Sequence, residues 1–239
     1  MNDITLMSVN WNTRPCLELM LKSYVKHHYT DQPLRLALWD NNSFDGSDVF
    51  LKENNIPFDA YTDNIGHEQA INVMYPLIKT RYVLLVDTDI IFNDNCWVYI
   101  DFLKNGTIAA GDLIRGDNLG SAVKPRLGAW FILFDITNCR AHGINTFRDT
   151  GDWSYDVGSH FYERLWMQNL GVHIIPRLPG HIDYDIEGMK YGTHSHLGKM
   201  SWNLEKHGDR KDEVYRRRVY VEERLKDFAD VDLTNKFIV

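Results

Sequence analysis

The chain has 239 residues, of which 44% are hydrophobic and 25% charged, so it has the composition of a globular protein with a sizeable core. The formal net charge of −7 argues against a general nucleic-acid coat protein, although it leaves room for a local basic patch. The sequence has no apolar run of about 18 residues and no basic N-terminal segment, so neither a membrane span nor a secretory signal is predicted. Because Cys16, Cys96 and Cys139 form no CxxC pair, we expect reduced thiols in a cytoplasmic protein.

The first 92 residues alternate predicted strands and helices. Strands are expected over 4–11, 34–40, 58–63 and 81–89, and helices over 14–28, 48–55 and 68–78. This alternation is typical of an α/β protein with a mostly parallel sheet flanked by helices. In such sheets, ligands bind beyond the carboxyl ends of the strands.

Polar residues occupy those carboxyl ends. Asn10 and Asn12 end the first strand, Asp40 ends the second, and Asp87 and Asp89 follow the most apolar strand of the chain. A carboxylate buried without a partner costs several kcal/mol. We therefore expect these side chains at the rim of a site rather than inside the core.

The spacing of Asp87 and Asp89 suggests a metal site. Alternate residues of an extended chain share a face, so both carboxylates can address one ligand. Mg²⁺ and Mn²⁺ take carboxylate oxygens together with substrate phosphates. The ordinary alternative is a strand end followed by a polar turn, but the position directly after an apolar strand favours the metal.

Four segments, in chain order, resemble the nucleotide-sugar-binding half of the GT-A glycosyltransferases, in particular the large family 2 type. They are SVNWNT (8–13), LWDNNSFDGS (38–47), NIGHEQAIN (64–72) and LLVDTD (84–89). One such motif is weak evidence, whereas four in order within residues 4–92 are strong. The sequence departs from the family at His67, where Phe or another aromatic is usual.

The resemblance implies a GT-A fold in a single compact domain over residues 1–200, with a donor-binding half (1–92), an acceptor-side half (93–200) and a C-terminal helical extension (201–239). It also implies that Asp89 holds the metal that bridges the donor diphosphate. The implied nucleotide-sugar-binding residues are Asn10, Trp11, Asn12, Asp40, Asn64, Gly66, His67, Asp87 and Thr88. The structural alternatives are an Asx-turn cap for Asp40 and a core position for Trp11.

In the second half, a helix is predicted over 94–105, strands over 107–114 and 128–136, and a helix over 157–171 that leads into another strand. The segment from Asp156 to Gly158 resembles an acceptor-side motif of some transferases of this fold. An inverting transferase needs a carboxylate to accept the acceptor proton, and we expect Asp156 first, Asp152 second and Glu163 third. The alternative is that Asp156 only caps the helix.

Two histidines, His194 and His196, lie in KYGTHSHLGKMSW (190–202). This segment resembles the place where a late histidine completes the metal shell in several GT-A enzymes. Neutral imidazole suits Mn²⁺ better than Mg²⁺. We expect one of the two histidines to bind the metal, with a slight preference for His194, although a structural role for both is the alternative.

The C-terminal segment 210–231 has the pattern of an amphipathic helix. Its ordinary interpretation is a helix packed on the domain. The alternative is that Arg216, Arg217 and Arg218 contact an anionic acceptor such as a nucleic acid, a lipid headgroup or an acidic glycan.

The sequence thus predicts a metal-dependent glycosyltransferase that uses a nucleotide-sugar, with UDP expected first, and a hydroxyl acceptor on a glycan, lipid, small molecule or modified DNA base. The second hypothesis is a non-catalytic nucleotide-sugar-binding or glycan-binding module on the same fold. A nucleotidyltransferase ranks last, because the first loop, NWNTRP, lacks glycines that could cradle a triphosphate.

Overall fold

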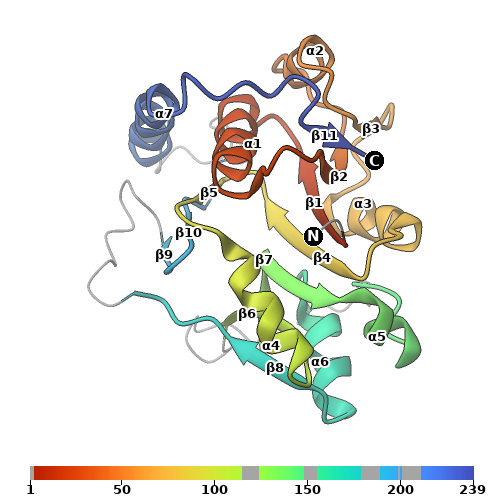
Figure 1. Cartoon of the computed structure of the whole chain (residues 1–239). Helices are drawn as coiled ribbons and strands as arrows, with labels where there is room; N and C mark the ends of the chain where they lie inside the picture. Colours follow the sequence, from red (N-terminus) through yellow and green to blue (C-terminus); the bar gives the residue numbers. More distant parts are fainter. Residues whose placement is uncertain (1–2, 115–123, 148–154, 179–188, 199, 201–210) are drawn as a thin grey trace.

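The computed structural model describes residues 3–114, 124–147, 155–178, 189–198, 200 and 211–239, with only the helical backbone described for 211–214. Within these ranges the chain forms one α/β domain around a central eight-stranded sheet (Figure 1). The strands follow the order β11-β2-β1-β4-β7-β6-β8, and β3 pairs with β2. Their bounds are β1 (Ile4–Asn10), β2 (Leu34–Asp40), β3 (Asp59–Ala60), β4 (Tyr82–Asp87), β6 (Thr107–Ile114), β7 (Arg126–Asp135), β8 (Gly171–Ile174) and β11 (Phe237–Ile238).

The sheet is mainly parallel, as predicted. Among the strands described, only β7 runs antiparallel to its neighbours in this sheet, β4 and β6. In β1, Leu6 packs into one apolar cluster together with Leu17 and Tyr24, whereas Met7 packs into a second cluster with Ile71 on the opposite face. Because both faces of the sheet are covered, its strands are almost continuously apolar.

Helices cover both faces of this sheet (Figure 1). Short 3₁₀ turns at Tyr75–Leu77 and Cys96–Tyr99 adjoin two of them. The helices are α1 (Arg14–His28), α2 (Ser47–Glu53), α3 (His67–Met74), α4 (Ile100–Lys104), α5 (Ile136–Ala141), α6 (Ser159–Met167) and α7 (Lys211–Lys226). Among the described residues, no helix has the length and apolar character needed to cross a membrane.

A second, three-stranded sheet begins directly after the predicted strand 81–89. The chain turns at Thr88 and Asp89, and β5 (Ile90–Phe92) leaves the central sheet. It pairs antiparallel with β10 (His194–His196), which pairs in turn with β9 (Met189–Lys190). The register places His196 opposite Ile90, so a segment about a hundred residues away reaches the end of β4.

The C-terminal residues are part of the domain. Strand β11 extends the central sheet beside β2, and α7 packs beside α1 (Figure 1). Val221 and Phe228, in and just after α7, belong to an apolar cluster with Cys16 and Leu19 of α1. The predicted packing of this helix is therefore confirmed.

The alternative interpretation, in which three consecutive arginines contact an anionic acceptor, does not hold for Arg217. Arg216 and Arg218 are exposed, but Arg217 is 2% exposed. A helix turns about 100° per residue, so neighbours in the sequence cannot all share the exposed face.

The three cysteines lie in separate parts of the core. Cys16, Cys96 and Cys139 are all buried and form no disulfide. Burial raises the pKa of each thiol, so all three remain protonated and unreactive at neutral pH.

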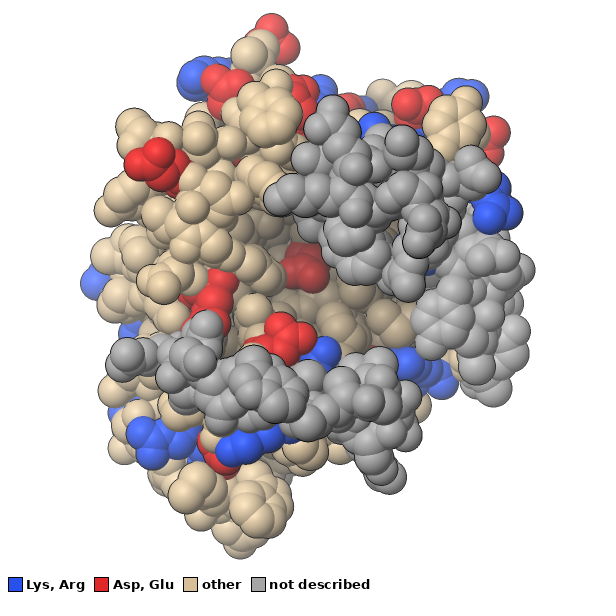
Figure 2. Space-filling view, turned by 180° about the vertical axis from the view of Figure 1, so that it is seen from behind, with Lys and Arg blue, Asp and Glu red and all other residues tan. Residues whose placement is uncertain are grey.

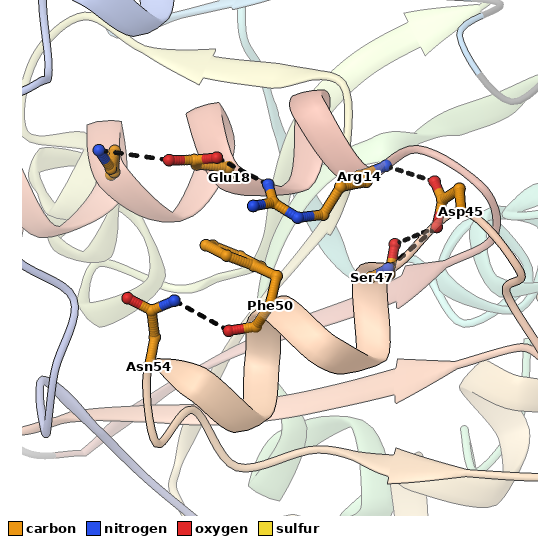
Figure 3. A network of polar contacts seen from close by, with 7 residues as sticks. Arg14, Glu18, Asp45, Ser47, Phe50 and Asn54 are labelled. Atoms are coloured by element: carbon orange, nitrogen blue, oxygen red, sulfur yellow. Dashed lines mark hydrogen bonds and ion pairs between the residues drawn. The ribbon is translucent and has the colours of Figure 1, made fainter.

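A polar network joins the first turns of α1 and α2 (Figure 3). The carboxylate of Asp45 accepts hydrogen bonds from the Arg14 amide at 2.7 Å and from the Ser47 hydroxyl at 2.6 Å. The Arg14 guanidinium lies 3.6 Å from the centre of the Phe50 ring and donates to Glu18 at 2.6 Å. These contacts fix the loops after β1 and β2 relative to each other.

We expect Asp45→Ala to destabilise the fold by about 1–2 kcal/mol, because the substitution leaves helix-terminal donors without an acceptor. The measurement is the free energy of unfolding in urea. Asp101→Ala is the control, since it removes only an exposed ion pair with Lys104 and should change stability by less than about 0.5 kcal/mol. Equal effects of the two substitutions would contradict a special role for Asp45.

Candidate active site

A cavity of about 360 Å³ lies beyond the carboxyl ends of β1, β2 and β4. Figure 2 shows one face of the molecule hollowed, with acidic side chains inside the hollow. The cavity is lined by Val9, Trp11, Thr13, Asn41, Asn64, Gly66, His67, Asp87, Thr88, Asp89 and His196. Most of the residues predicted for donor and metal binding are therefore brought together, and Val9, Thr13 and Asn41 were missed.

Asn10 and Asp40 do not line this cavity but join the strand ends beneath it. Asn10 donates to Asp40 at 2.6 Å and to Ser43 at 3.0 Å, and Asp40 accepts from the Ser43 amide at 3.0 Å. The side-chain oxygen of Asn10 accepts from Thr13 at 2.8 Å. Both side chains are buried with these partners, so their role here is to position the loops above them.

The loop after β1 turns at Asn12, whose φ of 54° lies in the left-handed region that Asn tolerates. Its side chain accepts a hydrogen bond from the Phe44 amide at 2.8 Å, so Asn12 shapes the loop instead of lining the cavity. Trp11 is half-buried and lines the cavity wall, which argues against the alternative of a core position.

Asn41 is one of the three wall residues that were not predicted from the sequence. It donates to Asn64 at 2.7 Å and accepts from the Ile65 amide at 2.9 Å, and Asn64 accepts from the Gly66 amide at 2.8 Å. The first Asn of DNNS in the second-strand motif was the available signal. These amides hold the loop before α3 against the end of β2.

The carboxylates of Asp87 and Asp89 face two imidazoles. Asp87 Oδ1 lies 3.4 Å from His67 Nε2, and Asp89 Oδ1 lies 3.3 Å from His196 Nε2. One ligand atom from each of Asp87, Asp89 and His196 lies within 4.8 Å of the others. Asp89 Oδ1 is buried and has no partner in hydrogen-bond geometry among the described residues, so this oxygen and an imidazole nitrogen are available to a divalent cation. These residues fit such a cation.

The two carboxylates have opposite electrostatic environments. Burial raises the pKa of Asp87, against the pull of His67 and with the help of the Asp89 charge. Burial alone would also raise the pKa of Asp89, but the His196 imidazole and the Met200 amide outweigh it and lower that pKa. Asp89 is therefore the more persistently ionised of the two groups.

His194 lies away from this group, so the slight preference for it over His196 does not agree with the structure. Its ring stacks on Phe131 at 3.7 Å and on Tyr191 at 4.4 Å, and it is 1% exposed. Burial lowers its pKa well below the usual value, so it is a neutral core residue. Because β10 is antiparallel to β5, His196 lies next to Asp89 and His194 lies opposite Phe92.

Asp156 lies just before α6 and is not among the residues that line the cavity. Its side chain is 54% exposed and pairs with Arg126 Nη2 at 2.9 Å. Burial is the main factor that raises the pKa of Asp87, and the charge of Asp156 adds a smaller contribution, so the two carboxylates interact electrostatically. The N-cap of α6 is Gly158, so Asp156 is not the cap residue.

The other two candidate bases are Asp152 and Glu163. Asp152 lies outside the described residues. Glu163 accepts from Lys124 at 3.0 Å and from the Tyr155 hydroxyl at 2.7 Å; partial burial would raise its pKa, but these two donors lower it. Glu163 is therefore a stabilised anion within a local network, which suits a base less well than the open position of Asp156.

No protein-family model matches the sequence, and no curated protein matches it. Among solved structures, the mannosyltransferase PcManGT from Pyrobaculum calidifontis, in complex with GDP-Man and Mn²⁺, is similar over 73% of this chain and 55% of its own, with a TM-score of 0.57 and 15% identity. S. aureus TarS 1-349 in complex with UDP-GlcNAc is similar over 61% of this chain and 48% of its own, with a TM-score of 0.47 and 12% identity.

The likeness to the first structure shows that this chain has the GT-A fold, as its sequence predicted. The chain spans about half the length of both solved chains. The fold is therefore shared at low sequence identity, and a shared fold does not by itself imply a shared reaction.

Gly158 provides a test of how the loop that carries Asp156 is placed. Its φ is +87°, and a Cβ there would lie 2.3 Å from the Leu127 carbonyl oxygen of β7. We expect Gly158→Ala to lower the free energy of unfolding by about 2–4 kcal/mol, since it combines backbone strain with a clash against the backbone.

The control for this prediction is Gly143→Ala. Gly143 also has a positive φ, of +70°, but a Cβ there would have no atom of the described residues within 4 Å. It should cost only about 1–2 kcal/mol. If urea unfolding gives the same loss for both variants, the close packing of Gly158 on β7 is not what fixes the Asp156 loop.

Proposed function

We propose that this protein is a metal-dependent glycosyltransferase that moves a sugar from a nucleotide-sugar donor to an acceptor hydroxyl. The observation that carries the proposal is the convergence of Asp87, Asp89 and His196 in one cavity. The charge of Asp156 also acts on Asp87. On a GT-A fold, these are the groups needed to bind a diphosphate and to accept a proton.

The donor side uses the cavity at the ends of β1, β2 and β4. Trp11 offers an aromatic wall, Asn64 and Gly66 belong to a hydrogen-bonded loop, and His67 faces Asp87. When bound, a divalent cation would neutralise the charge on the departing nucleoside diphosphate. Asp89 and His196 are the residues that would hold the cation, with Asp87 as the third ligand or as a contact to the ribose.

For the metal we prefer Mn²⁺ to Mg²⁺, and for the nucleotide we prefer UDP to GDP. An imidazole nitrogen in the ligand set favours Mn²⁺ over Mg²⁺. UDP is the first expectation for the nucleotide. GDP is tested beside it, because the mannosyltransferase PcManGT was solved with GDP-Man.

On the acceptor side, we assign Asp156 as the base that accepts the proton of the attacking hydroxyl. Its carboxylate is half-exposed, and Arg126, itself 8% exposed, holds it in place. Asp152 remains the alternative base. The acceptor class stays open among glycans, lipids, small molecules and modified DNA bases.

The second candidate function is a nucleotide-sugar-binding or glycan-binding module without catalysis. The presence of a carboxylate held by Arg126, in addition to the metal group, favours the enzyme, because a binding module does not need a base. The two functions differ in whether the wild-type protein turns over a donor that it binds.

We expect one nucleoside diphosphate to raise the melting temperature only when Mn²⁺ is present, and Asp89→Asn to abolish this shift while leaving the ligand-free melting temperature nearly unchanged. A ligand that binds the native state alone stabilises it by mass action. The measurement is a thermal-shift panel of UDP, GDP, CDP and TDP with and without Mn²⁺. A shift that survives in Asp89→Asn with the same metal dependence would show that Asp89 is not a metal ligand.

We expect Asp156→Asn to retain donor binding but to reduce sugar transfer by about 10²- to 10⁴-fold, because the amide cannot accept the acceptor proton. Transfer is measured with radiolabelled donor, and binding by the thermal shift. Asp101→Asn, on a carboxylate with a 74% exposed side chain, is the control and should leave both unchanged. Unaltered turnover in Asp156→Asn would move the base elsewhere, and a wild type that binds donor without turnover would favour the binding module.

A further inference from the structure

The buried Arg217 of α7 has an unusual set of partners. Its side chain is 2% exposed, and Nη1 donates at 2.5 Å both to the Leu197 carbonyl and to the Gly198 carbonyl. A buried cation is costly unless it is well hydrogen-bonded, so the position is maintained by these contacts. The two carbonyls belong to the segment that directly follows His196.

That segment is also bound to the DxD turn. The Leu197 amide donates to the Asp89 carbonyl at 3.0 Å, and the Met200 amide approaches an Asp89 carboxylate oxygen at 3.5 Å. The backbone that Arg217 holds therefore contacts Asp89 on one side and carries His196 on the other.

Gly198 lies between the arginine and the metal-binding imidazole. A Cβ on Gly198 would lie 3.6 Å from His196 Cε1 and 3.8 Å from Arg217 Nη1. Its φ of +70° makes the turn that directs two successive carbonyls toward α7. Arg217 thus acts on the backbone immediately beside the His196 ring.

The His196 ring also has contacts outside the segment that Arg217 binds. Its ring stacks on Trp130 of β7, with 4.8 Å between centroids and an angle of 14° between the planes. One turn further along α7, Val221 packs in the apolar cluster that includes Ile91 and Leu197. The imidazole is therefore fixed by β5, β7 and α7 together.

We infer that Arg217 is a positioning residue for the metal site, which places His196 against Asp89 and couples the binding of a divalent cation to the docking of α7. This inference rests on the proposed function, since it requires that Asp89 and His196 bind the metal. Partners that orient a ligand without touching the metal commonly change metal affinity by about 10- to 100-fold.

The test is Mn²⁺ affinity of the full chain without donor, measured from free Mn²⁺ by electron paramagnetic resonance. We expect Arg217→Met, which keeps an apolar stem of similar length, to weaken Mn²⁺ binding at least about tenfold. Arg217→Lys should restore most of the affinity, because an ammonium can donate to both carbonyls. Arg216→Met, on the adjacent exposed arginine, should bind Mn²⁺ like the wild type.

Three results separate this inference from the proposed function. If the wild type binds Mn²⁺ and Arg217→Met binds it equally well, the positioning role is wrong and the proposed function stands. If the wild type does not bind Mn²⁺, or Asp89→Asn binds it unchanged, the metal assignment fails and the inference fails with it. An equal loss in Arg216→Met would also contradict the inference, because it would indicate a general effect of helix charge.

A second measurement does not depend on the folding of a variant. Coupling is reciprocal, so Mn²⁺ bound at His196 must stabilise the docked position of α7. In the wild type, we expect Mn²⁺ to slow amide hydrogen exchange in peptides from residues 215–226 as well as in those from 194–198. Protection limited to the latter peptides would overturn the proposed coupling.

Discussion

The structure around the site depends on one physical constraint, the burial of the Asp89 carboxylate at the end of the most apolar strand. A buried carboxylate must have positive or hydrogen-bonding partners, or it takes up a proton. Here the partners are the His196 imidazole and the Met200 amide, both from a segment more than a hundred residues later. The small sheet of β5 and β10, and the contact of that segment with α7, bring these partners to Asp89.

The same polar residue types have different roles at the ends of β1, β2 and β4. Asn10 and Asp40 form hydrogen bonds with each other and with the adjacent loop. The side-chain amide of Asn10 donates one hydrogen bond to Asp40 and one to Ser43. By contrast, Asp89 keeps a buried oxygen without a hydrogen bond from the described residues. The difference arises from the supply of local donors, because the turn after β2 brings the Ser43 amide to Asp40, whereas Asp89 relies on a distant segment.

Local patterns in the sequence were sufficient to predict the parallel strands, the GT-A fold and most of the cavity wall, because these depend on periodicity and on motifs at strand ends. They were insufficient for β10, which is three residues long, polar at all three positions and paired with a distant strand. The choice of His196 over His194 follows from that antiparallel register. The burial of Arg217 follows from the packing of α7 on the domain. Neither the position of His196 nor the burial of Arg217 can be predicted from the residues next to them in the sequence.

The proposed acceptor side does not follow the rule that sites lie at the carboxyl ends of strands. Strand β7 is antiparallel to β4, so its beginning, not its end, reaches the site. Arg126 therefore opens the strand beside Asp156, and Leu127 packs against Gly158 at the start of α6. The proposed donor side is built from the ends of parallel strands, and the proposed acceptor side from the start of an antiparallel one. Asp87 ends the parallel strand β4, whereas Arg126 at the start of the antiparallel β7 pairs with Asp156. The proposed metal ligands and the candidate base are therefore positioned by strands of opposite direction within one domain.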